Sequence, residues 1–310
     1  MSARLLDGNA VANQIREEIR PRVEAYRARH GRPPGLGIVL VGDDPASHVY
    51  VRNKVKSGMD VGFAVDLHQM PASSSLDEVL AVVDRLNRSE THDGILVQSP
   101  LPPALGDEAE RVVFDAIDPA KDVDGFSPVN VGRLVQKRAV LMACTPAGIV
   151  ELLERSGIPI AGQRAVIIGR SDIVGKPMAM MLLHRDATVT LCHSKTRDLA
   201  GVAASADILV AAIGRAGFVT TDFVKAGATV VDVGMNRVDD PAVAARLFSP
   251  GSAKLEQFAR KGSVLVGDVH PSVAEVAGAL TPVPGGVGPL TIALLMKNTL
   301  RAAEARAGRP

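Results

Sequence analysis

The sequence predicts an α/β protein with two α/β domains, the second of them a Rossmann-type doubly wound parallel sheet. Three observations support this prediction. Short β-branched runs alternate with amphipathic helical patterns along most of the chain. A glycine-containing turn follows the buried run 165–168 and leads into an apolar helix. The length of 310 residues is sufficient for roughly two hydrophobic cores.

Composition narrows the class of protein and its compartment. The net charge of +1 gives no reason to expect nucleic acid or an anionic membrane as a partner. No apolar run approaches the ~20 residues that span a bilayer, and the N-terminus lacks the apolar core of a signal peptide. Cys144 and Cys192 have no metal-type spacing and are expected to be reduced thiols. We therefore expect a cytoplasmic protein without a metal site.

The first half of the chain predicts strands and helices in alternation. A helix is expected first, with Pro21 kinking or dividing it. The expected helices are 7–30, 45–60 and 75–87, and the expected strands are 35–41, 63–69 and 94–98. This order predicts a parallel sheet, and ligands of such sheets gather at the carboxyl ends of the strands.

The second half repeats the alternation, and a domain boundary is expected near Cys144. A helix over 145–156 precedes the second sheet. The expected strands are 165–168, 188–192, 208–213, 229–233 and, as a sixth candidate, 263–266. The expected helices are the later part of the segment 165–181, then 197–205 and 221–225. Loop and short helix are expected over 239–261. The segment 281–289 is too rich in proline and glycine to be regular, and a closing helix begins at Pro289.

The predicted helix 45–60 carries a candidate site on one face. Ser47, Tyr50 and Lys54 follow the spacing i, i+3, i+7, which places them together at the margin of the core. A lysine in such a place can serve in proton transfer. Gln98 ends a buried strand, where its carbonyl could hold a lysine amine and its NH₂ could meet a substrate. The alternatives are a solvated stripe with a partly buried Tyr50 ring, and an amide that caps a loop.

Three acidic residues of the segment IDPAKDVDG form another candidate site: Asp118, Asp122 and Asp124. They do not fit the calcium-loop pattern, which requires a glycine at its sixth position and a distant glutamate. We expect one carboxylate to recognise a ligand with two adjacent N–H donors, and the others to form turns.

The turn after the strand 165–168 resembles a dinucleotide-binding loop in an irregular form. Gly169 ends the strand, Ser171 stands where the fingerprint has its second glycine, and Gly175 arrives one residue late. A helix start here suits a pyrophosphate, although a βα turn without a ligand is the alternative.

The segment after the next strand indicates which dinucleotide is bound. It reads CHSKTR and offers hydroxyls and cations where a cofactor without a 2′-phosphate would meet an acid. Together with Arg170 and Ser171, this composition favours NADP over NAD. A solvated polar loop is the alternative.

With these residues in hand, the chain resembles the bifunctional methylenetetrahydrofolate dehydrogenase and methenyltetrahydrofolate cyclohydrolase family over nearly its whole length. The motifs that carry the resemblance are SHVYVRNKVK, GILVQSPLP, PAKDVDG, CTPAG, IGRSDIVGKP, TVTLCHSKT, DILVAAIG and TPVPGGVGPLT, in this order.

The resemblance implies a homodimer whose subunits have two α/β domains flanking a cleft. Residues 1–143 would bind folate, 144–283 would bind NADP, and 284–310 would be a glycine-rich loop and a helix returning to the first domain. The implied catalytic residues are Lys54, which would transfer the proton, Gln98, which would be bonded to it, and Tyr50. The implied folate contacts are Tyr50, Ser47, Asp124, Gly285 and Gly286. The implied cofactor contacts are Gly169, Arg170, Ser171, Gly175, Ser194 and Ile213.

The implied chemistry is oxidation of 5,10-methylenetetrahydrofolate by NADP⁺ and hydrolysis of the methenyl product to 10-formyltetrahydrofolate. Ser99, Ala143 and the continuation after Asp268 depart from the family pattern, and we expect an ordinary loop histidine at His270. Two rivals remain. Tyr50 and Lys54 also fit the Y-x-x-x-K spacing of short-chain dehydrogenases, although there the cofactor loop comes first. A non-catalytic NADP sensor is the other rival.

Overall fold

The computed structural model describes residues 3–308, which divide into two compact units. The first unit holds residues Ala12–Cys144 together with those from Thr291 onward. The second unit holds the residues up to Val11 together with Thr145–Leu290. The sequence placed divisions at 143/144 and 283/284 and gave all of the N-terminal residues to the first domain. The chain instead also changes units after Val11, because its first strand pairs with the sheet of the second unit.

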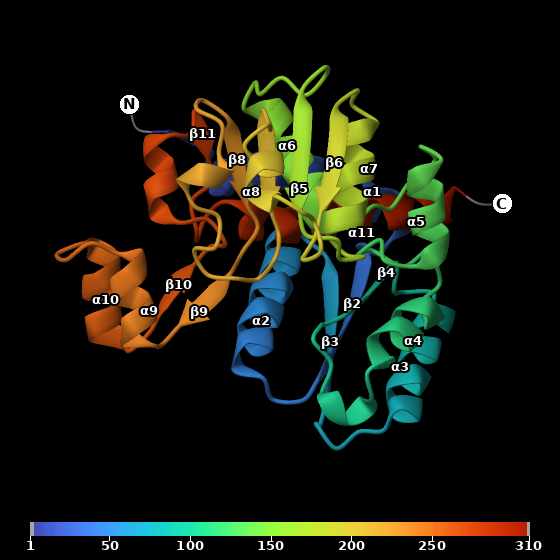
Figure 1. Cartoon of the computed structure of the whole chain (residues 1–310). Coiled ribbons are helices and arrows are strands. Elements are labelled where there is room, and N and C mark those ends of the chain that lie inside the picture. Colours follow the sequence, from blue (N-terminus) through green and yellow to red (C-terminus); the bar gives the residue numbers. More distant parts are fainter. Residues whose placement is uncertain (1–2, 309–310) are drawn as a thin grey trace. The chain divides into compact units, whose positions relative to one another are not determined.

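The sheet of the first unit has three parallel strands in the order β3-β2-β4 (Figure 1). They are β2 (Gly35–Val41), β3 (Ala64–Met70) and β4 (Gly94–Val97). Every residue of β2 and β4 is buried, as expected for strands covered on both faces. The outer strand β3 is largely exposed. The expectation of a parallel α/β first domain is confirmed.

Helices cover both faces of this small sheet. Figure 1 shows α2 (Pro45–Asp60) on one side of the strands, and α3 (Leu76–Arg88) with α4 (Ala109–Ala116) on the other. Valines 39 and 41 of β2 pack with Val79 and Val83 of α3 in one apolar cluster. The remaining elements of the unit are the turn η1 (Pro103–Leu105), α5 (Pro128–Val135) and most of α11 (Val287–Ala307).

Helix α1 (Gly8–His30) is undivided although it contains Pro21. The division considered from the sequence was therefore wrong. Proline removes one backbone donor, which frees the carbonyl of Glu17. Both residues lie on the exposed face of the helix, where water can satisfy that carbonyl.

The second unit is built on a six-stranded parallel sheet in the order β1-β11-β8-β7-β5-β6. Its strands are β1 (Arg4–Leu5), β5 (Arg164–Ile168), β6 (Thr188–Cys192), β7 (Ile208–Ala211), β8 (Thr229–Asp232) and β11 (Ala279–Leu280). Its helices and turns are α6 (Cys144–Arg155), α7 (Gly175–Leu183), α8 (Leu199–Ala203), η2 (Thr221–Phe223), α9 (Pro241–Leu247), α10 (Ala253–Lys261) and η3 (Pro271–Glu275). The predicted Rossmann-type sheet is confirmed, and its order reverses at β5, the place where such sheets bind ligands.

The sixth strand was expected at the wrong place. Residues 264–266 do form a strand, β10 (Val264–Val266), but it pairs antiparallel with β9 (Asn236–Val238) in a separate two-stranded sheet. The outer positions of the main sheet belong to β11 and β1 instead. Each of these has only two residues, too few to show any hydrophobic period in the sequence.

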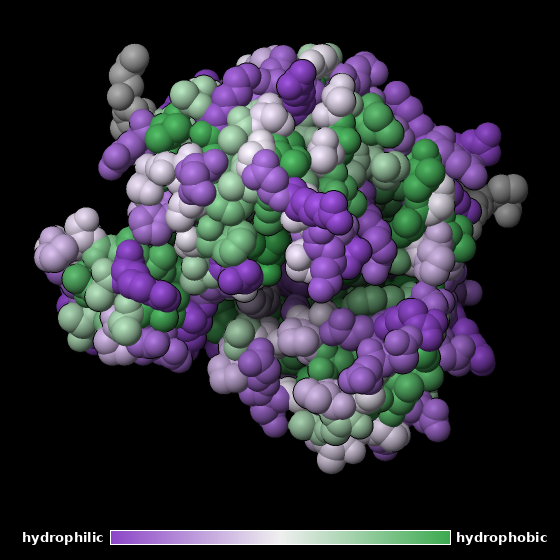
Figure 2. Space-filling model, in the orientation of Figure 1, coloured by the Kyte–Doolittle hydropathy of each residue, from purple (hydrophilic) through white to green (hydrophobic). Residues whose placement is uncertain are grey.

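Surface composition agrees with the balanced charge. Hydrophilic and hydrophobic residues are interspersed over the visible face (Figure 2). Among the described helices, none has both the length and the apolar content needed to cross a membrane.

Candidate functional site

Helix α2 presents the predicted lysine face. Asp44 begins the helix by accepting a hydrogen bond from the backbone N–H of Ser47 at 2.7 Å, and Pro45 occupies the first helical position. Ser47 is buried, while Tyr50 and Lys54 are half-buried. Burial raises the pKa of the Tyr50 hydroxyl above its usual value. The three side chains therefore stand at the margin of the core, as their spacing predicts.

Gln98 lies directly after β4 and contacts the lysine. Lys54 Nζ donates to Gln98 Oε1 at 2.9 Å. The amide of Gln98 donates from Nε2 to the carbonyl of Ser99 at 2.5 Å, so one hydrogen of the NH₂ expected to meet a substrate is already used. Ser99 in turn donates from its hydroxyl to Glu110 at 2.6 Å. The Lys54 amine is thus held by an acceptor whose own orientation is fixed.

Three acidic residues of the segment 118–124 have different surroundings. Asp118 accepts from the N–H of Ala120, two residues later. Asp122 is buried and accepts from the N–H groups of Gly125 and Ser127. Both therefore act as turn formers.

Asp124 is the carboxylate of this segment that remains for a ligand. Burial raises its pKa to about 6, Lys54 opposes that rise, and Asp122 adds to it. The Lys54 amine is close enough to Asp124 to lower the pKa of this carboxyl group. An amine and a carboxyl group of the first unit therefore influence each other electrostatically.

Asn298 of α11 supports the backbone beside Asp124, a role that was not predicted from the sequence. Its buried amide donates to the carbonyl of Val123 at 2.9 Å and to the carbonyl of Met142 at 2.8 Å. Val123 directly precedes Asp124, and a Cβ on Gly125 would lie 2.4 Å from the carbonyl carbon of Met142. Since 175 positions separate Asn298 from Val123, no local sequence pattern could show this contact.

Cys144 lies in the same region as a buried thiol. Its Sγ donates to the carbonyl of Val123 at 3.2 Å, and Asn298 Nδ2 lies 3.5 Å from Sγ. Burial raises the pKa of the Cys144 thiol well above its ordinary value, and Asp124 contributes to the rise. A thiol of this kind is an inert packing group.

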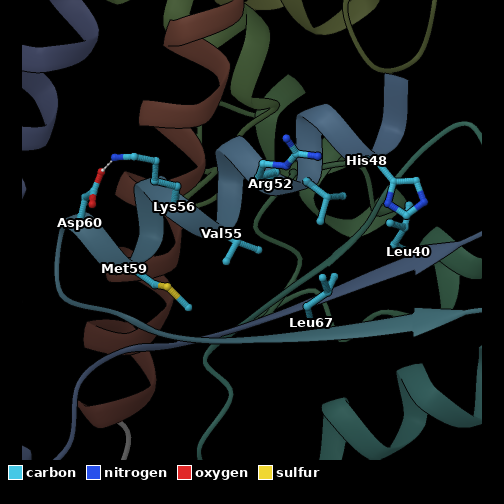
Figure 3. A pocket seen from close by; sticks show the side chains of 9 residues that line it. Leu40, His48, Arg52, Val55, Lys56, Met59, Asp60 and Leu67 are labelled. Atoms are coloured by element: carbon cyan, nitrogen blue, oxygen red, sulfur yellow. Dashed lines mark hydrogen bonds and ion pairs between the residues drawn. The ribbon is translucent and has the colours of Figure 1, made fainter. Parts of the chain in front are cut away.

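The other face of α2 lines a separate groove of about 420 Å³. Figure 3 shows Val55 of α2 and Leu67 of β3 pointing into it, with His48 and Arg52 along its upper side. Residues 48, 52 and 55 lie well away in helical angle from the side that carries Lys54. The groove is therefore not part of the lysine site.

The turn after β5 in the second unit is closely packed. Gly169 has φ +126°, and a Cβ there would lie 2.1 Å from the carbonyl oxygen of Ala212. A Cβ on Gly175 would lie 2.1 Å from the carbonyl oxygen of Gly169. Both predicted cofactor glycines are thus required for the close approach of backbone segments at the start of α7.

Ser171 uses its hydroxyl within this turn. Its Oγ accepts from the N–H groups of Val174 at 3.2 Å and Gly175 at 3.3 Å. Two of the donors that the sequence offered to a ligand are therefore already satisfied. The Ser171 hydroxyl keeps its own hydrogen to donate.

Exposed cations and a hydroxyl surround the carboxyl ends of β5 and β6. Arg170 is exposed and forms no ion pair with any residue in the range 3–308. After β6, the N–H of His193 donates to Thr196 Oγ1 at 2.9 Å, which leaves Ser194 and Lys195 at the tip of a tight turn. These groups suit a phosphate, and neighbouring parallel strands bring them to one edge of the sheet.

Ile213 follows β7 in a loop that a buried carboxylate holds. Asp268 accepts from the N–H groups of Ile213, at 2.7 Å, and of the two residues after it. The sequence marked Ile213 as a cofactor contact but gave no role to Asp268. The contact spans 55 positions, so it leaves no local trace.

The predicted glycine-rich loop packs against the beginning of α1. Gly285 has φ +103° and accepts from the N–H of Asn9 at 3.2 Å. The carbonyl oxygen of Gly286 would lie 1.6 Å from a Cβ on Gly8. Gly285 is favoured by its positive φ, and a Cβ on Gly286 would lie 2.6 Å from the carbonyl oxygen of Pro282, so both glycines have a packing reason that is independent of any ligand.

His270 begins the turn η3, where its Nδ1 accepts from the N–H of Ser272 at 3.2 Å. This capping contact agrees with an ordinary loop histidine. Within the described part of the chain, no group of three or more His, Cys, Asp or Glu side chains could hold a metal ion.

Two family models match the chain. Residues 6–124 match "Tetrahydrofolate dehydrogenase/cyclohydrolase, catalytic domain", and residues 143–307 match "Tetrahydrofolate dehydrogenase/cyclohydrolase, NAD(P)-binding domain".

Relatives match over nearly the full length. The bifunctional protein FolD of Solibacter usitatus is 58% identical, with 98% of this chain and 99% of the relative covered. The bifunctional protein FolD of Koribacter versatilis is 53% identical over 99% of each chain. The solved structure of the Campylobacter jejuni bifunctional enzyme FolD is 38% identical, with a TM-score of 0.84 and with 98% of this chain and 100% of that chain covered. The Trypanosoma brucei methylenetetrahydrofolate dehydrogenase-cyclohydrolase, solved with NADP and an inhibitor, is also 38% identical. The Trypanosoma brucei structure covers 100% of both chains at a TM-score of 0.88.

Proposed function

The chain belongs to the tetrahydrofolate dehydrogenase/cyclohydrolase family, and we propose that its two units carry the two halves of that activity. The enzyme oxidises 5,10-methylenetetrahydrofolate with NADP⁺ to 5,10-methenyltetrahydrofolate and hydrolyses this cation to 10-formyltetrahydrofolate. Folate is assigned to the first unit and NADP to the second. The observation that carries the proposal is the hydrogen bond between Lys54 and Gln98 beside Asp124, a proton-transfer pair next to an acceptor.

The residues of the second unit fit NADP. The cradle at Gly169 and Gly175 has no room for a Cβ, so backbone can approach a pyrophosphate closely. Arg170, Ser194 and Ser171 provide the cation and hydroxyl donors that a 2′-phosphate and the pyrophosphate require. When bound, NADP⁺ supplies the acceptor for a hydride.

The chain's contribution to hydride transfer is positioning. The methylene carbon loses a hydride directly, so no side chain has to remove a proton in this step. Asp124 accepts hydrogen bonds from the N–H edge of the pterin, and Tyr50 packs against the pterin and aminobenzoate rings. Ser47 supports the lysine face from within α2. Gly285 and Gly286 approach both ligands, and Ile213 contacts the cofactor.

Hydrolysis of the methenyl cation requires proton management. Water adds to the methenyl carbon and releases one proton. Its second proton passes to N5 as the bond between that carbon and N5 breaks, which leaves the formyl group on N10. Lys54 takes up and returns the transferred proton at its Nζ atom, and this atom donates a hydrogen bond to Gln98 Oε1 at 2.9 Å. Without this hydrogen bond the flexible lysine side chain would sample many rotamers, so Gln98 orients the amine.

A homodimer in the cytoplasm is the remaining part of the proposal. The groove between α2 and β3 is lined by five apolar side chains together with His48, Arg52, Lys56 and Asp60, and its Met59 and Leu67 are 58% and 43% exposed. Strand β3 also has an uncovered edge in its sheet, and a second copy of the chain would cover both features. The two buried cysteines form no disulfide, which fits a reducing compartment. Substitution of Leu67 by Asp should then shift the mass measured by light scattering from dimer to monomer.

The two rival functions are less consistent with the chain. Tyr50 and Lys54 belong to the first unit, whereas the nucleotide turn at Gly169 belongs to the second, unlike the order in short-chain dehydrogenases. An inert sensor would have no use for an oriented lysine, and this chain keeps both Lys54 and Gln98.

A two-substrate assay tests the proposal. The purified protein is mixed with 5,10-methylenetetrahydrofolate and NADP⁺, reduced nicotinamide is followed by absorbance, and 10-formyltetrahydrofolate is identified by mass. We expect both products. Folate binding without reduction of NADP⁺ would support the sensor, and reduction without formyl product would remove the cyclohydrolase half.

A further inference from the structure

Two buried carboxyl groups of the second unit lie near the carboxyl ends of strands β7 and β8. Asp232 is the last residue of β8, and Asp268 follows β10. Both are buried, and Asp268 is 0% exposed. Buried carboxylates are costly unless hydrogen bonds satisfy them, so their partners indicate what they do.

Asp268 fills a nest of backbone donors. Its Oδ2 accepts from the N–H groups of Ile213 at 2.7 Å and Gly214 at 3.0 Å, and its Oδ1 accepts from the N–H of Arg215 at 2.8 Å. Asn236 Nδ2 donates to Oδ1 at 2.9 Å. Three successive N–H groups of this kind form an anion-binding concavity. Here the anion is part of the chain.

Asp232 in turn holds Asp268. Its carboxyl oxygens accept from the N–H groups of Asp268 at 2.8 Å, Val269 at 3.0 Å and Gly234 at 2.9 Å. Burial raises the pKa of Asp232 to about 7, and Asp268 contributes to the rise. The chain of contacts therefore runs from the end of β8 through Asp268 to the loop after β7.

The order of the strands gives this loop a place in the cofactor site. In a doubly wound sheet the pyrophosphate lies at the turn after the first strand, and the adenosine ribose meets the end of the second. These strands are β5 and β6, and the cations Arg170 and Lys195 follow them. The other half of the dinucleotide must extend across β5 toward β7 and β8, where Asp232 and Asp268 hold loop 213–215.

We propose that Asp268 is a positioning residue for NADP⁺: it holds loop 213–215 in the shape that receives the nicotinamide half and closes the backbone nest to phosphate. This inference rests on the proposed NADP site and adds a residue to it. Asp268 acts through the loop and touches no reacting atom.

Asp268→Asn tests the inference by calorimetric titration with NADP⁺. An asparagine turns one acceptor oxygen into a donor that opposes the loop N–H groups. We expect NADP⁺ to bind about tenfold more weakly, since one such lost contact corresponds to roughly 1.4 kcal/mol. The KM for NADP⁺ should rise in parallel while the KM for the folate substrate stays unchanged.

Asp207→Asn is the matched control. Asp207 also accepts a backbone N–H, that of Arg164 at 2.9 Å, but it precedes β7 at the amino edge of the same sheet. We expect this variant to bind NADP⁺ within about twofold of the unchanged protein. Wild-type affinity in a cooperatively melting Asp268→Asn variant would overturn the inference, as would an equal loss in both variants.

Hydrogen exchange of the unchanged protein provides a test that does not depend on how the variant folds. The amides of residues 213–215 should exchange slowly before any cofactor is added, because Asp268 already binds them. Fast exchange that becomes slow only with NADP⁺ would contradict the inference. A failure of the unchanged protein to bind NADP⁺ would instead remove the proposed function itself.

Discussion

Lys54 and Gln98 are 44 positions apart in the sequence and share a hydrogen bond of 2.9 Å from Nζ to Oε1. One comes from the middle of α2 and the other from the residue after β4. The second end of the amide is fixed by the carbonyl of Ser99, so Gln98 can present only its oxygen to the lysine. The Lys54 amine therefore has a defined direction.

Lys54→Met should separate the two activities. Hydration of the methenyl cation needs the amine, whereas hydride transfer does not. We expect cyclohydrolase activity to fall by at least about a hundredfold, the scale of general acid–base catalysis, with NADP-dependent dehydrogenase activity still measurable. Separate assays of the two reactions measure this, and equal loss of both in a folded variant would contradict the role given to Lys54.

Asp124→Asn should weaken folate binding and raise the melting temperature of the protein near pH 8. The carboxyl group has a folded pKa of about 6, above its unfolded value, so the folded state binds the proton more tightly. Its contribution to stability is present below the unfolded pKa and is lost as the pH rises through about 6. The variant should therefore gain melting temperature relative to the unchanged protein near pH 8 but not near pH 4, while folate binding weakens. Thermal melts at both pH values and folate titrations check this; a lower melting temperature near pH 8 would argue against it.

Asn298→Ala should loosen the loop that carries Asp124. The carbonyl of Met142 would lose its Asn298 donor and that of Val123 would keep only the Cys144 thiol, at a cost of about 1–3 kcal/mol in the free energy of unfolding. The KM for folate should rise as well. Urea denaturation and steady-state kinetics measure both effects. Thr299→Val is the control, because the Thr299 hydroxyl is equally buried but donates only within its own helix, to the carbonyl of Leu295.

Arg170→Ala should reduce the preference for NADP over NAD. A charge-assisted contact to the 2′-phosphate is worth about 1.5–3 kcal/mol, so kcat/KM for NADP⁺ should fall by about tenfold to a hundredfold. The value for NAD⁺ should change little. Arg164→Ala, an exposed arginine at the amino end of β5, should leave both values unaltered. A parallel decline for NADP⁺ and NAD⁺ with Arg170→Ala would show that the arginine serves some other purpose.

Local periodicity was sufficient to predict much of the fold. The expected strands 35–41 and 188–192 and the expected helix 45–60 have the observed bounds. The helix could be predicted well because Asp44 and Pro45 mark its beginning in the sequence. The helix face that carries Lys54 follows from the same periodicity, so the candidate site of the first unit could be predicted from the sequence.

Features that depend on distant contacts were not visible. Strands β1 and β11 have two residues each; β11 is a strand only because β8 provides an edge to pair with, and β1 only because β11 does. Asp268 and Asn298 act on backbone groups far away in the sequence, and nothing beside them distinguishes them from other polar residues. A helix was expected over 221–225, but the structure has only the three-residue turn η2 there, since so short a segment gains too few hydrogen bonds to offset the cost of starting a helix.

The division of the first unit into two separated segments has a consequence for synthesis of the chain on the ribosome. Residues Ala12–Cys144 emerge first, but the segment from Thr291 onward that completes their unit emerges last. Until then the loop before Asp124 lacks its Asn298 clamp, and the close contact between Gly94 and Thr299 is missing. A nascent chain that already contains Lys54, Gln98 and Asp124 would therefore hold these side chains without the helix that completes their unit.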